Sequence, residues 1–341
     1  MRSGANLDMT TTSSHTPPIS GVIEEQIVSG QLLPLVIRPA EKDVALLGIV
    51  SENRKLVRER LLRHGGVLFR GFSDVTVDTF RQLIATLSGD PLDYHERSSP
   101  RHEVGNRIYT STDYPHEQEI LLHNEQSYNL TWPLHIFFHC VVAAQTGGAT
   151  PLADCRKVYR RISADTRKKL ESGYCYARHF GGVIGLPWRE AFQTSQRSAV
   201  EEYCRANGID YTWGQDDTLS TRQIRPVVRP HPDTGETTWF NHLTFFNIST
   251  LDKDTVDTLF LLGKDQLPNN TYYADGSDIE SAVFEELRSA YLSEQVSFPW
   301  HAGDILMLDN MLVAHGREPF TPPREVVVGM ASPTHDVRPG G

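Results

Sequence analysis

The residues best suited to chemistry are His123 and Glu125, which stand two positions apart within residues 122–128. On a β-strand, side chains two positions apart point to the same face, so this imidazole and this carboxylate would project into one space. They would supply two of the three ligands of a 2-His-1-carboxylate site, which holds Fe(II) on one face and leaves other positions open. The best candidate for the third ligand is His315, just after an apolar run that is expected to be a strand.

Less specific interpretations exist for all three side chains. A His-x-Glu pair alone often arises by chance, so His123 and Glu125 could be an ordinary surface pair on a strand. His315 could be a buried structural histidine.

Short apolar and β-branched runs predict the strands that would carry these residues. They lie at residues 65–72, 120–122, 134–144, 237–248, 305–308 and 325–331. Helical spacing occurs at residues 41–63 and 76–87, and Ser277 with Glu280 matches a capping box opening a helix to about residue 292. Because the strands do not alternate regularly with helices, a doubly wound parallel sheet is disfavoured. We expect a mainly β fold with helical insertions (α+β), namely a double-stranded β-helix or jelly roll.

Composition limits the function classes and the organisation of the chain. We expect one domain at residues 21–341, after a flexible tail at residues 1–20 that is rich in Thr, Ser and Pro. The net charge of −10 argues against general nucleic-acid binding. No run approaches the roughly 20 apolar residues of a membrane helix. The four cysteines contain no C-x-x-C pair, which indicates reduced thiols in a cytoplasmic protein.

Six segments spread along the chain carry a resemblance to a known family. They are GGVLFRGF at 65–72, HNE at 123–125, GGATPLAD at 147–154, WFN at 239–241, WHAGD at 300–304 and AHGR at 314–317. On these segments, the chain resembles the TauD/TfdA family of Fe(II)- and 2-oxoglutarate-dependent dioxygenases over roughly residues 35–335. Within that family it is most similar to the SyrP-like branch, whose members hydroxylate amino acids on peptide assembly lines.

The resemblance implies a jelly-roll core, iron held by His123, Glu125 and His315, and 2-oxoglutarate and O2 as co-substrates. It further implies hydroxylation of an unactivated C–H bond in a small amino-acid-like substrate, free or tethered to a carrier protein, in secondary metabolism. Related halogenases lack the carboxylate ligand, so the presence of Glu125 favours hydroxylation over halogenation.

The far carboxylate of 2-oxoglutarate needs a cation and a hydroxyl. Arginine suits it because the planar guanidinium binds a carboxylate through two parallel hydrogen bonds. Arg324 begins the last predicted strand, where alternation places it on the inward face. Thr150 matches a family position that also contacts this carboxylate. Relatives often carry two adjacent arginines whereas this chain has one, so Arg317 is the second candidate.

Two weaker expectations concern the substrate and a partner. Asn241 and His242 are expected to face the substrate, with a purely structural role as the alternative. Residues 156–169 carry seven basic side chains against one acid. This run is either a solvated helical face or a dock for an acidic carrier protein through Arg156, Arg160 and Lys168.

Other reactions remain open at the same site. Desaturation begins with the same hydrogen abstraction as hydroxylation. A non-oxidative enzyme could hold zinc in the three ligands and activate water, and a binding protein could have kept the fold without catalysis. Succinate release that requires both iron and O2 would separate these classes.

Overall fold

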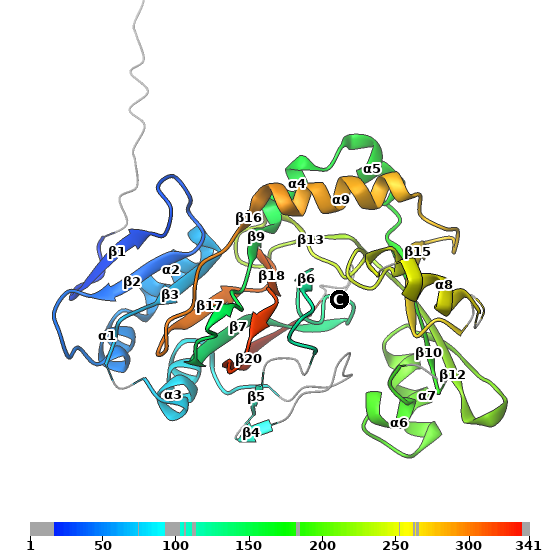
Figure 1. Cartoon of the computed structure of the whole chain (residues 1–341), viewed down its shortest axis with the longest axis horizontal. Helices are drawn as coiled ribbons and strands as arrows, with labels where there is room; N and C mark the ends of the chain where they lie inside the picture. Colours follow the sequence, from blue (N-terminus) through cyan, green and yellow to red (C-terminus); the bar gives the residue numbers. More distant parts are fainter. Residues whose placement is uncertain are drawn as a thin grey trace, which may run out of the picture.

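The computed structural model describes residues 17–73, 75–92, 103–105, 107–110, 114–181, 185–251, 253–261, 263 and 266–335 (Figure 1). Most of the predicted tail at 1–20 lies outside these residues. At its end, however, Ile19 is buried and Arg60 donates a hydrogen bond to the carbonyl of Pro17, so the tail ends earlier than predicted. No helix in the described part of the chain combines the length and the apolar character needed to cross a lipid bilayer.

The larger sheet contains eight strands within the described residues. Their order is β1 (Val22–Gln26), β2 (Leu35–Pro39), β3 (Gly66–Phe69), β17 (Ile305–Asp309), β7 (Thr131–Val142), β20 (Glu325–His335), β5 (Ile108–Thr110) and β4 (Glu103–Gly105). Neighbouring strands are antiparallel, except that β2 and β3 run parallel. The central strands therefore come from distant parts of the sequence.

A smaller sheet faces the larger one. It consists of β16 (Gln295–Val296), β9 (Leu152–Asp154), β18 (Val313–Arg317) and β6 (Ile120–His123), with β8 (Thr146–Gly147) and β19 (Phe320–Thr321) pairing at one end. Side chains of both sheets share one core, among them Leu68, Ile136, Phe138, Leu152, Leu306, Val313, Val326 and Val328. This is the expected jelly roll.

Helices cover the outer face of the larger sheet. They are α1 (Leu46–Glu52), α2 (Arg54–His64) and α3 (Val77–Ser88), and they pack on the alternate side chains of the strands, including Val67, Phe69, Phe137, Ile305, Met307 and Val327. Burial on both faces explains why these strands read as continuous apolar runs. The single helix expected at 41–63 is two helices, with Asn53 between them.

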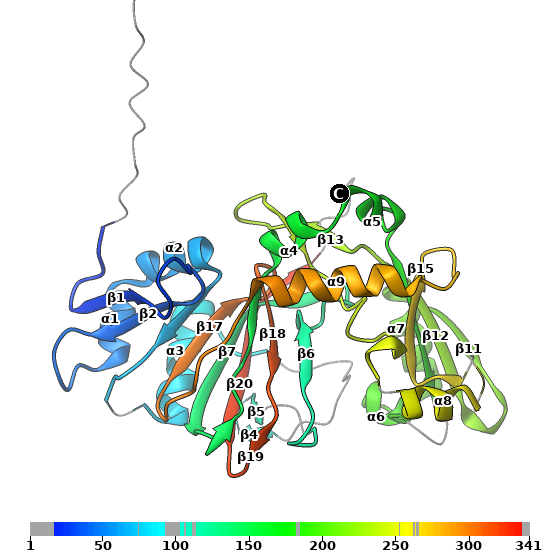
Figure 2. The same cartoon turned by 45° about the horizontal axis from the view of Figure 1, so that its top comes forward.

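The chain between β9 and β16 forms an insertion. It contains α4 (Cys155–Arg161), α5 (Ala164–Lys169), a sheet in the order β11 (Asp210–Trp213), β12 (Leu219–Arg225), β10 (Tyr174–Phe180) and β15 (Asn269–Tyr273), and the helices α6 (Trp188–Ala191), α7 (Arg197–Ala206) and α8 (Lys253–Leu261). A small core of its own holds α6 and α7 to this sheet, with Trp188 and Val200 at its centre. Helix α9 (Ser281–Glu294) runs from this sheet back to the jelly roll (Figures 1 and 2).

Two local predictions in the insertion were wrong. The strand expected at 237–248 is only β14 (Thr237–Trp239), which pairs with β13 (Val228–Pro230). It ends because the amide of Asn241 bonds the backbone at Val227 and Leu243, and Asn247 caps the short helix η2 (Ile248–Thr250). The expected capping box at Ser277 is absent, since Ser277 bonds Asp275 and α9 begins at Ser281.

Candidate metal centre

Three predicted ligands converge at one point of the jelly roll. His123, Glu125 and His315 each offer a ligand atom, and these atoms all lie within 4.8 Å of one another. The imidazole rings of His123 and His315 are 4.6 Å apart, and all three residues are at least nine-tenths buried. Two imidazoles and a carboxylate are the donor set that suits a divalent first-row metal such as Fe(II) and leaves part of the coordination sphere open.

The two histidines come from neighbouring strands of the smaller sheet. His123 ends β6 and is the direct cross-strand partner of His315 on β18. The strands approach closely at Gly316, where a Cβ atom would lie 2.5 Å from the carbonyl oxygen of Ile120, so only glycine fits. The Nδ1 of His123 lies 2.8 Å from the carbonyl of Leu121, which can only accept a hydrogen bond. Nδ1 therefore carries the proton, and Nε2 presents its lone pair to the site.

Glu125 reaches the same point from a turn, not from strand alternation as expected. Strand β6 ends at His123, and residues 125–128 form a turn in which Gln126 has φ of 54°. The turn is held by the side chain of Asn310, which accepts from the Glu125 N–H at 2.8 Å and donates to the Glu125 carbonyl at 2.8 Å. The amide of Asn124 donates in turn to the Asn310 carbonyl at 2.7 Å. Asn310 thus fixes the backbone that carries the carboxylate.

A buried carboxylate braces the loop that carries Asn310. Asp309 accepts hydrogen bonds from the backbone N–H groups of Met311 and Leu312 at 3.0 Å, and its other oxygen lies 2.8 Å from Nε2 of His231. His231 Nδ1 accepts from the backbone at Asp233, so Nε2 is the protonated nitrogen that donates to Asp309. Sequence reasoning missed Asp309, Asn310 and His231; the only signal was a polar pair directly after an apolar strand.

Beside the histidines lies a cavity that contains the predicted carboxylate-binding side chains. Its wall includes His123 and His315 together with Thr150, Arg317 and Arg324, and apolar side chains from β7 and β20. Thr150 is buried, and its hydroxyl accepts a hydrogen bond from the indole N–H of Trp300 at 3.1 Å. Because an indole can only donate, the hydroxyl proton of Thr150 remains for an acceptor in the cavity.

The two candidate arginines make different hydrogen bonds to the backbone. Arg317 donates to the backbone carbonyls of Tyr114, Pro115 and Gln118. Arg324 donates from Nε to the carbonyl of Gly148 at 2.9 Å. Burial lowers the pKa of Arg324 to about 10, and repulsion from Arg317 adds to this, yet the guanidinium stays charged at neutral pH. Because Arg317 is held by three backbone carbonyls, Arg324, which lines the same cavity, remains the first candidate for an anionic ligand.

The two predicted substrate residues occupy different positions. Asn241 is buried and uses its side-chain amide on the backbone at Val227 and Leu243, so nothing supports a substrate contact. The ring of His242 lies 5.6 Å from that of His123, and its Nδ1 is 2.6 Å from the hydroxyl of Ser127. Burial, with repulsion from the nearby histidines, holds the pKa of His242 well below its ordinary value.

Many basic side chains of residues 156–169, the predicted docking face, form ion pairs with carboxylates of the same chain. Arg156 contacts Asp154 at 2.9 Å and Glu236 at 3.1 Å, and its side chain is only 11% exposed. Other ion pairs in this run join Lys157 and Arg161 to Glu294, and Lys169 to Glu280. The prediction that Arg156 is part of a docking face is therefore wrong, while Arg160 and Lys168 are exposed.

Comparisons with known proteins cover most of the chain. The family model described as "Taurine catabolism dioxygenase TauD, TfdA family" matches residues 33–330. The dapdiamide synthesis protein DdaC of Enterobacter agglomerans is 39% identical over 281 residues, which cover 82% of this chain and 85% of that protein.

Solved structures give the same fold. PvcB, described as an Fe, alpha-ketoglutarate dependent oxygenase from an isonitrile synthetic pathway, matches with a TM-score of 0.52 at 14% identity, covering 87% of this chain and 85% of PvcB. AAD-2, solved in complex with Mn(II) and N-oxalylglycine, matches with a TM-score of 0.53 at 12% identity, covering 92% of this chain and 98% of AAD-2.

Proposed function

The chain belongs to the TauD/TfdA family of dioxygenases, oxidoreductases that depend on Fe(II), 2-oxoglutarate and O2, and we propose that it hydroxylates an unactivated C–H bond of a small amino-acid-like substrate. The observation that carries this proposal is the convergence of His123, Glu125 and His315 within 4.8 Å, beside a cavity that contains Thr150 and Arg324. When bound, the iron and 2-oxoglutarate would supply the oxidant from O2, while the 2-oxo acid loses CO2 and becomes succinate.

The protein's own contribution begins with the ligands and their supports. His123, Glu125 and His315 would hold the ion, with His123 oriented by its bond to the Leu121 carbonyl and Glu125 by Asn310. Such supporting contacts fix the direction of a ligand and raise metal affinity.

A second group of residues would position the co-substrate. Arg324 would pair with its far carboxylate, and the proton of Thr150 would donate to the same group. Trp300 keeps the Thr150 hydroxyl in the orientation this requires.

Apolar side chains shield the centre from water. The ring of Phe138 lies 5.2 Å from that of His315, and the ring of Phe245 lies 4.5 Å from that of His123. Val326 and Val328 complete the wall of the adjacent cavity. Excluding water protects a reactive oxidant from side reactions. Because Glu125 supplies a carboxylate to the ion, we propose hydroxylation in preference to halogenation.

Further parts of the proposal concern context. We place the enzyme in secondary metabolism, since DdaC is named for dapdiamide synthesis and PvcB for an isonitrile pathway. The substrate is free or carrier-tethered, and an acidic carrier would contact Arg160 and Lys168. A reducing, cytoplasmic location accords with four buried cysteine thiols in the described chain.

The decisive test is anaerobic reconstitution of the metal-free protein with Fe(II) and 2-oxoglutarate. Amino acids and carrier-bound aminoacyl groups are then added with O2, and succinate and product are measured. We expect succinate to form only when iron, O2 and a substrate are all present, and His315→Ala to abolish it. Turnover with zinc and without 2-oxoglutarate would instead support a hydrolytic enzyme, and a product two hydrogens lighter than the substrate would identify desaturation.

A further inference from the structure

Two buried arginines of the insertion reach the turn that carries Glu125. Arg225 ends strand β12 and Arg229 lies on β13, and only 4% and 3% of their surfaces are exposed. Buried and exposed positions alternate along β12, so Arg225 faces inward, whereas its neighbour Ile224 is 55% exposed. Burying an arginine beside an exposed isoleucine reverses the usual preference of the two side chains. A buried charge needs compensating polar contacts, so the partners of these guanidinium groups are informative.

Arg225 joins three segments of the chain. Its Nε donates to the carbonyl of Tyr128 at 2.8 Å, and its Nη2 donates to the carbonyl of Asn207 at 2.9 Å. Nη2 also donates to the side-chain oxygen of Gln223 at 2.7 Å, and the Gln223 amide donates to the Tyr128 carbonyl at 3.3 Å. Tyr128 is the last residue of the turn at 125–128, and Asn207 caps the C-terminal end of α7. Arg225 therefore ties the turn to the insertion.

Arg229 holds the preceding residue of the turn. Its Nη1 donates to the carbonyls of Ser127 and Phe240, both at 3.2 Å. The guanidinium carbon lies 4.6 Å from the centre of the Trp132 ring, whose face attracts a cation. Two successive carbonyls, those of Ser127 and Tyr128, thus accept hydrogen bonds from buried cations. Such bonds are stronger than those between neutral groups, so this end of the turn is firmly held.

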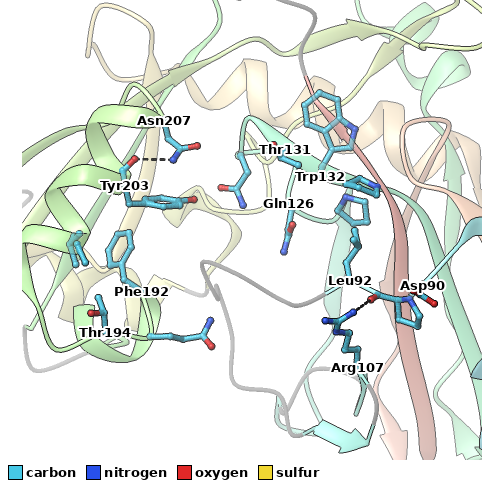
Figure 3. Close-up of a pocket in the computed structure, with 17 residues that line it drawn as sticks. Asp90, Leu92, Arg107, Gln126, Thr131, Trp132, Phe192, Thr194, Tyr203 and Asn207 are labelled. Atoms are coloured by element: carbon cyan, nitrogen blue, oxygen red, sulfur yellow. Dashed lines mark hydrogen bonds between the residues drawn. The ribbon is translucent and has the colours of Figure 1, made fainter.

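A cavity of about 710 Å³ lies beside the turn, between the jelly roll and the insertion. Figure 3 shows Asn207 and Tyr203 on one side of this cavity, Trp132 on the other, and Gln126 between them. Side chains that line a cavity lack packing partners on that side. The hydrogen bonds of Arg225 therefore supply a connection between the turn and the end of α7 that packing across the cavity does not provide.

The turn is also held from the jelly-roll side. The side chain of Asn310 bonds the N–H and the carbonyl of Glu125, both at 2.8 Å. Asn310 thus fixes the first residue of the turn, and the two arginines fix the last two. Between these anchors Gln126 has φ of 54°, a left-handed conformation that is uncommon for a residue other than glycine. Because such a conformation persists only when its surroundings hold it, the direction of the Glu125 carboxylate depends on both anchors.

We propose that Arg225 and Arg229 are positioning residues of the metal centre, which set the direction of the Glu125 carboxylate from the insertion. This inference rests on the metal site of the proposed function and adds that the insertion takes part in metal binding. Neither arginine is proposed as a ligand, since both act through the backbone of the turn. Their loss should therefore weaken the contribution of Glu125 and leave that of His123 and His315.

A double-mutant cycle separates this role from general destabilisation. Ni(II) is the probe, because nitrogen and oxygen sites bind it more tightly than Fe(II) and the affinity stays measurable when one ligand is removed. Equilibrium dialysis against the metal-free, full-length protein compares Arg225→Met and Arg229→Met, each with Glu125 present and with Glu125→Ala. We expect each arginine variant to weaken Ni(II) binding about tenfold when Glu125 is present, and less than about twofold when Glu125 is replaced.

Two further variants control for folding. Arg225→Lys keeps the charge but lacks the planar fork that reaches two carbonyls at once, so it should weaken Ni(II) binding by at least about threefold. It gives the same comparison if a methionine variant does not fold, which urea unfolding shows. Arg60 on α2 is also buried and donates to the carbonyl of Pro17 at 2.7 Å. Arg60→Met therefore removes a buried arginine from outside the turn and should keep the wild-type Ni(II) affinity.

The outcomes separate this inference from the function on which it rests. Wild-type Ni(II) affinity in the arginine variants, or equal weakening with and without Glu125, would overturn the positioning role. If the wild type binds Ni(II) and His315→Ala lowers its affinity, that failure concerns the arginines alone. If the wild type binds no Ni(II), or His315→Ala binds as tightly as the wild type, the metal site and the proposed function fail together with the inference.

Discussion

Replacing Asn310 with alanine should weaken metal binding through the loss of one side chain that contacts no metal. Asn310 is fully buried and makes three hydrogen bonds from its amide, at 2.8 Å each, to the Glu125 N–H and to the carbonyls of Glu125 and Pro133. At about 1 kcal/mol net for each bond, the free energy of unfolding should fall by about 3 kcal/mol. The turn that presents the Glu125 carboxylate would lose its anchor.

Metal affinity is the measurement that reports on positioning. Losing a residue that orients a ligand typically costs about 10- to 100-fold in affinity, and we expect that range for Asn310→Ala. Equilibrium dialysis of Mn(II) against the metal-free protein gives the affinity, and urea unfolding gives the stability. Asn310→Asp keeps the acceptor for the Glu125 N–H but places a carboxylate against the carbonyls of Glu125 and Pro133. We therefore expect it to bind metal no more tightly than Asn310→Ala does.

Asn241→Ala is the matched control. Asn241 is also buried, and its amide makes two backbone hydrogen bonds, at 2.8 Å and 3.0 Å. We expect a loss of about 2 kcal/mol in stability with unchanged Mn(II) affinity. The reasoning is refuted if Asn310→Ala loses stability but keeps wild-type affinity, or if both variants lose affinity equally.

Three further predictions follow from buried charges and thiols. Arg324→Leu should raise the KM for 2-oxoglutarate about 100-fold in steady-state assays, because a two-bond pair with a carboxylate is worth about 3 kcal/mol; an unchanged KM would assign the carboxylate to another cation. Burial raises the pKa of the Cys140 and Cys155 thiols to about 12, and only the thiolate reacts. At pH 8 about one thiol in ten thousand is ionised, so mass spectrometry should show iodoacetamide labelling of these two only after unfolding, and rapid native labelling would contradict this. In the wild-type protein the buried Asp304 carboxylate lies 2.5 Å from the Arg70 guanidinium, and Arg70→Met would leave that carboxylate without its partner. Urea unfolding should show that the free energy of unfolding falls by about 3 to 5 kcal/mol. A fall below about 1 kcal/mol would show that the Arg70–Asp304 pair does not stabilise the fold.

Local patterns in the sequence predicted the main strands of the jelly roll and named the three candidate ligands. The runs at 65–72, 134–144, 305–308 and 325–331 could be predicted as strands because each carries apolar side chains at successive positions, which is a property of the segment alone. In the structure both faces of these strands are buried. Asp154 and Ser163 cap α4 and α5, and such caps are local because a cap bonds backbone groups two or three residues away.

Tertiary structure decided what those residues do. Strand alternation was the wrong reason for pairing His123 with Glu125, since the turn that brings them together is set by Asn310, far along the chain. Arg156 is only 11% exposed and pairs with Glu236, which no local pattern in the sequence connects to it. The pocket lined by Trp132, Phe192 and Tyr203 exists only because the insertion folds against the jelly roll. Periodicity reports which face of one element is buried, whereas hydrogen bonds and ion pairs between distant segments depend on where the whole chain places them.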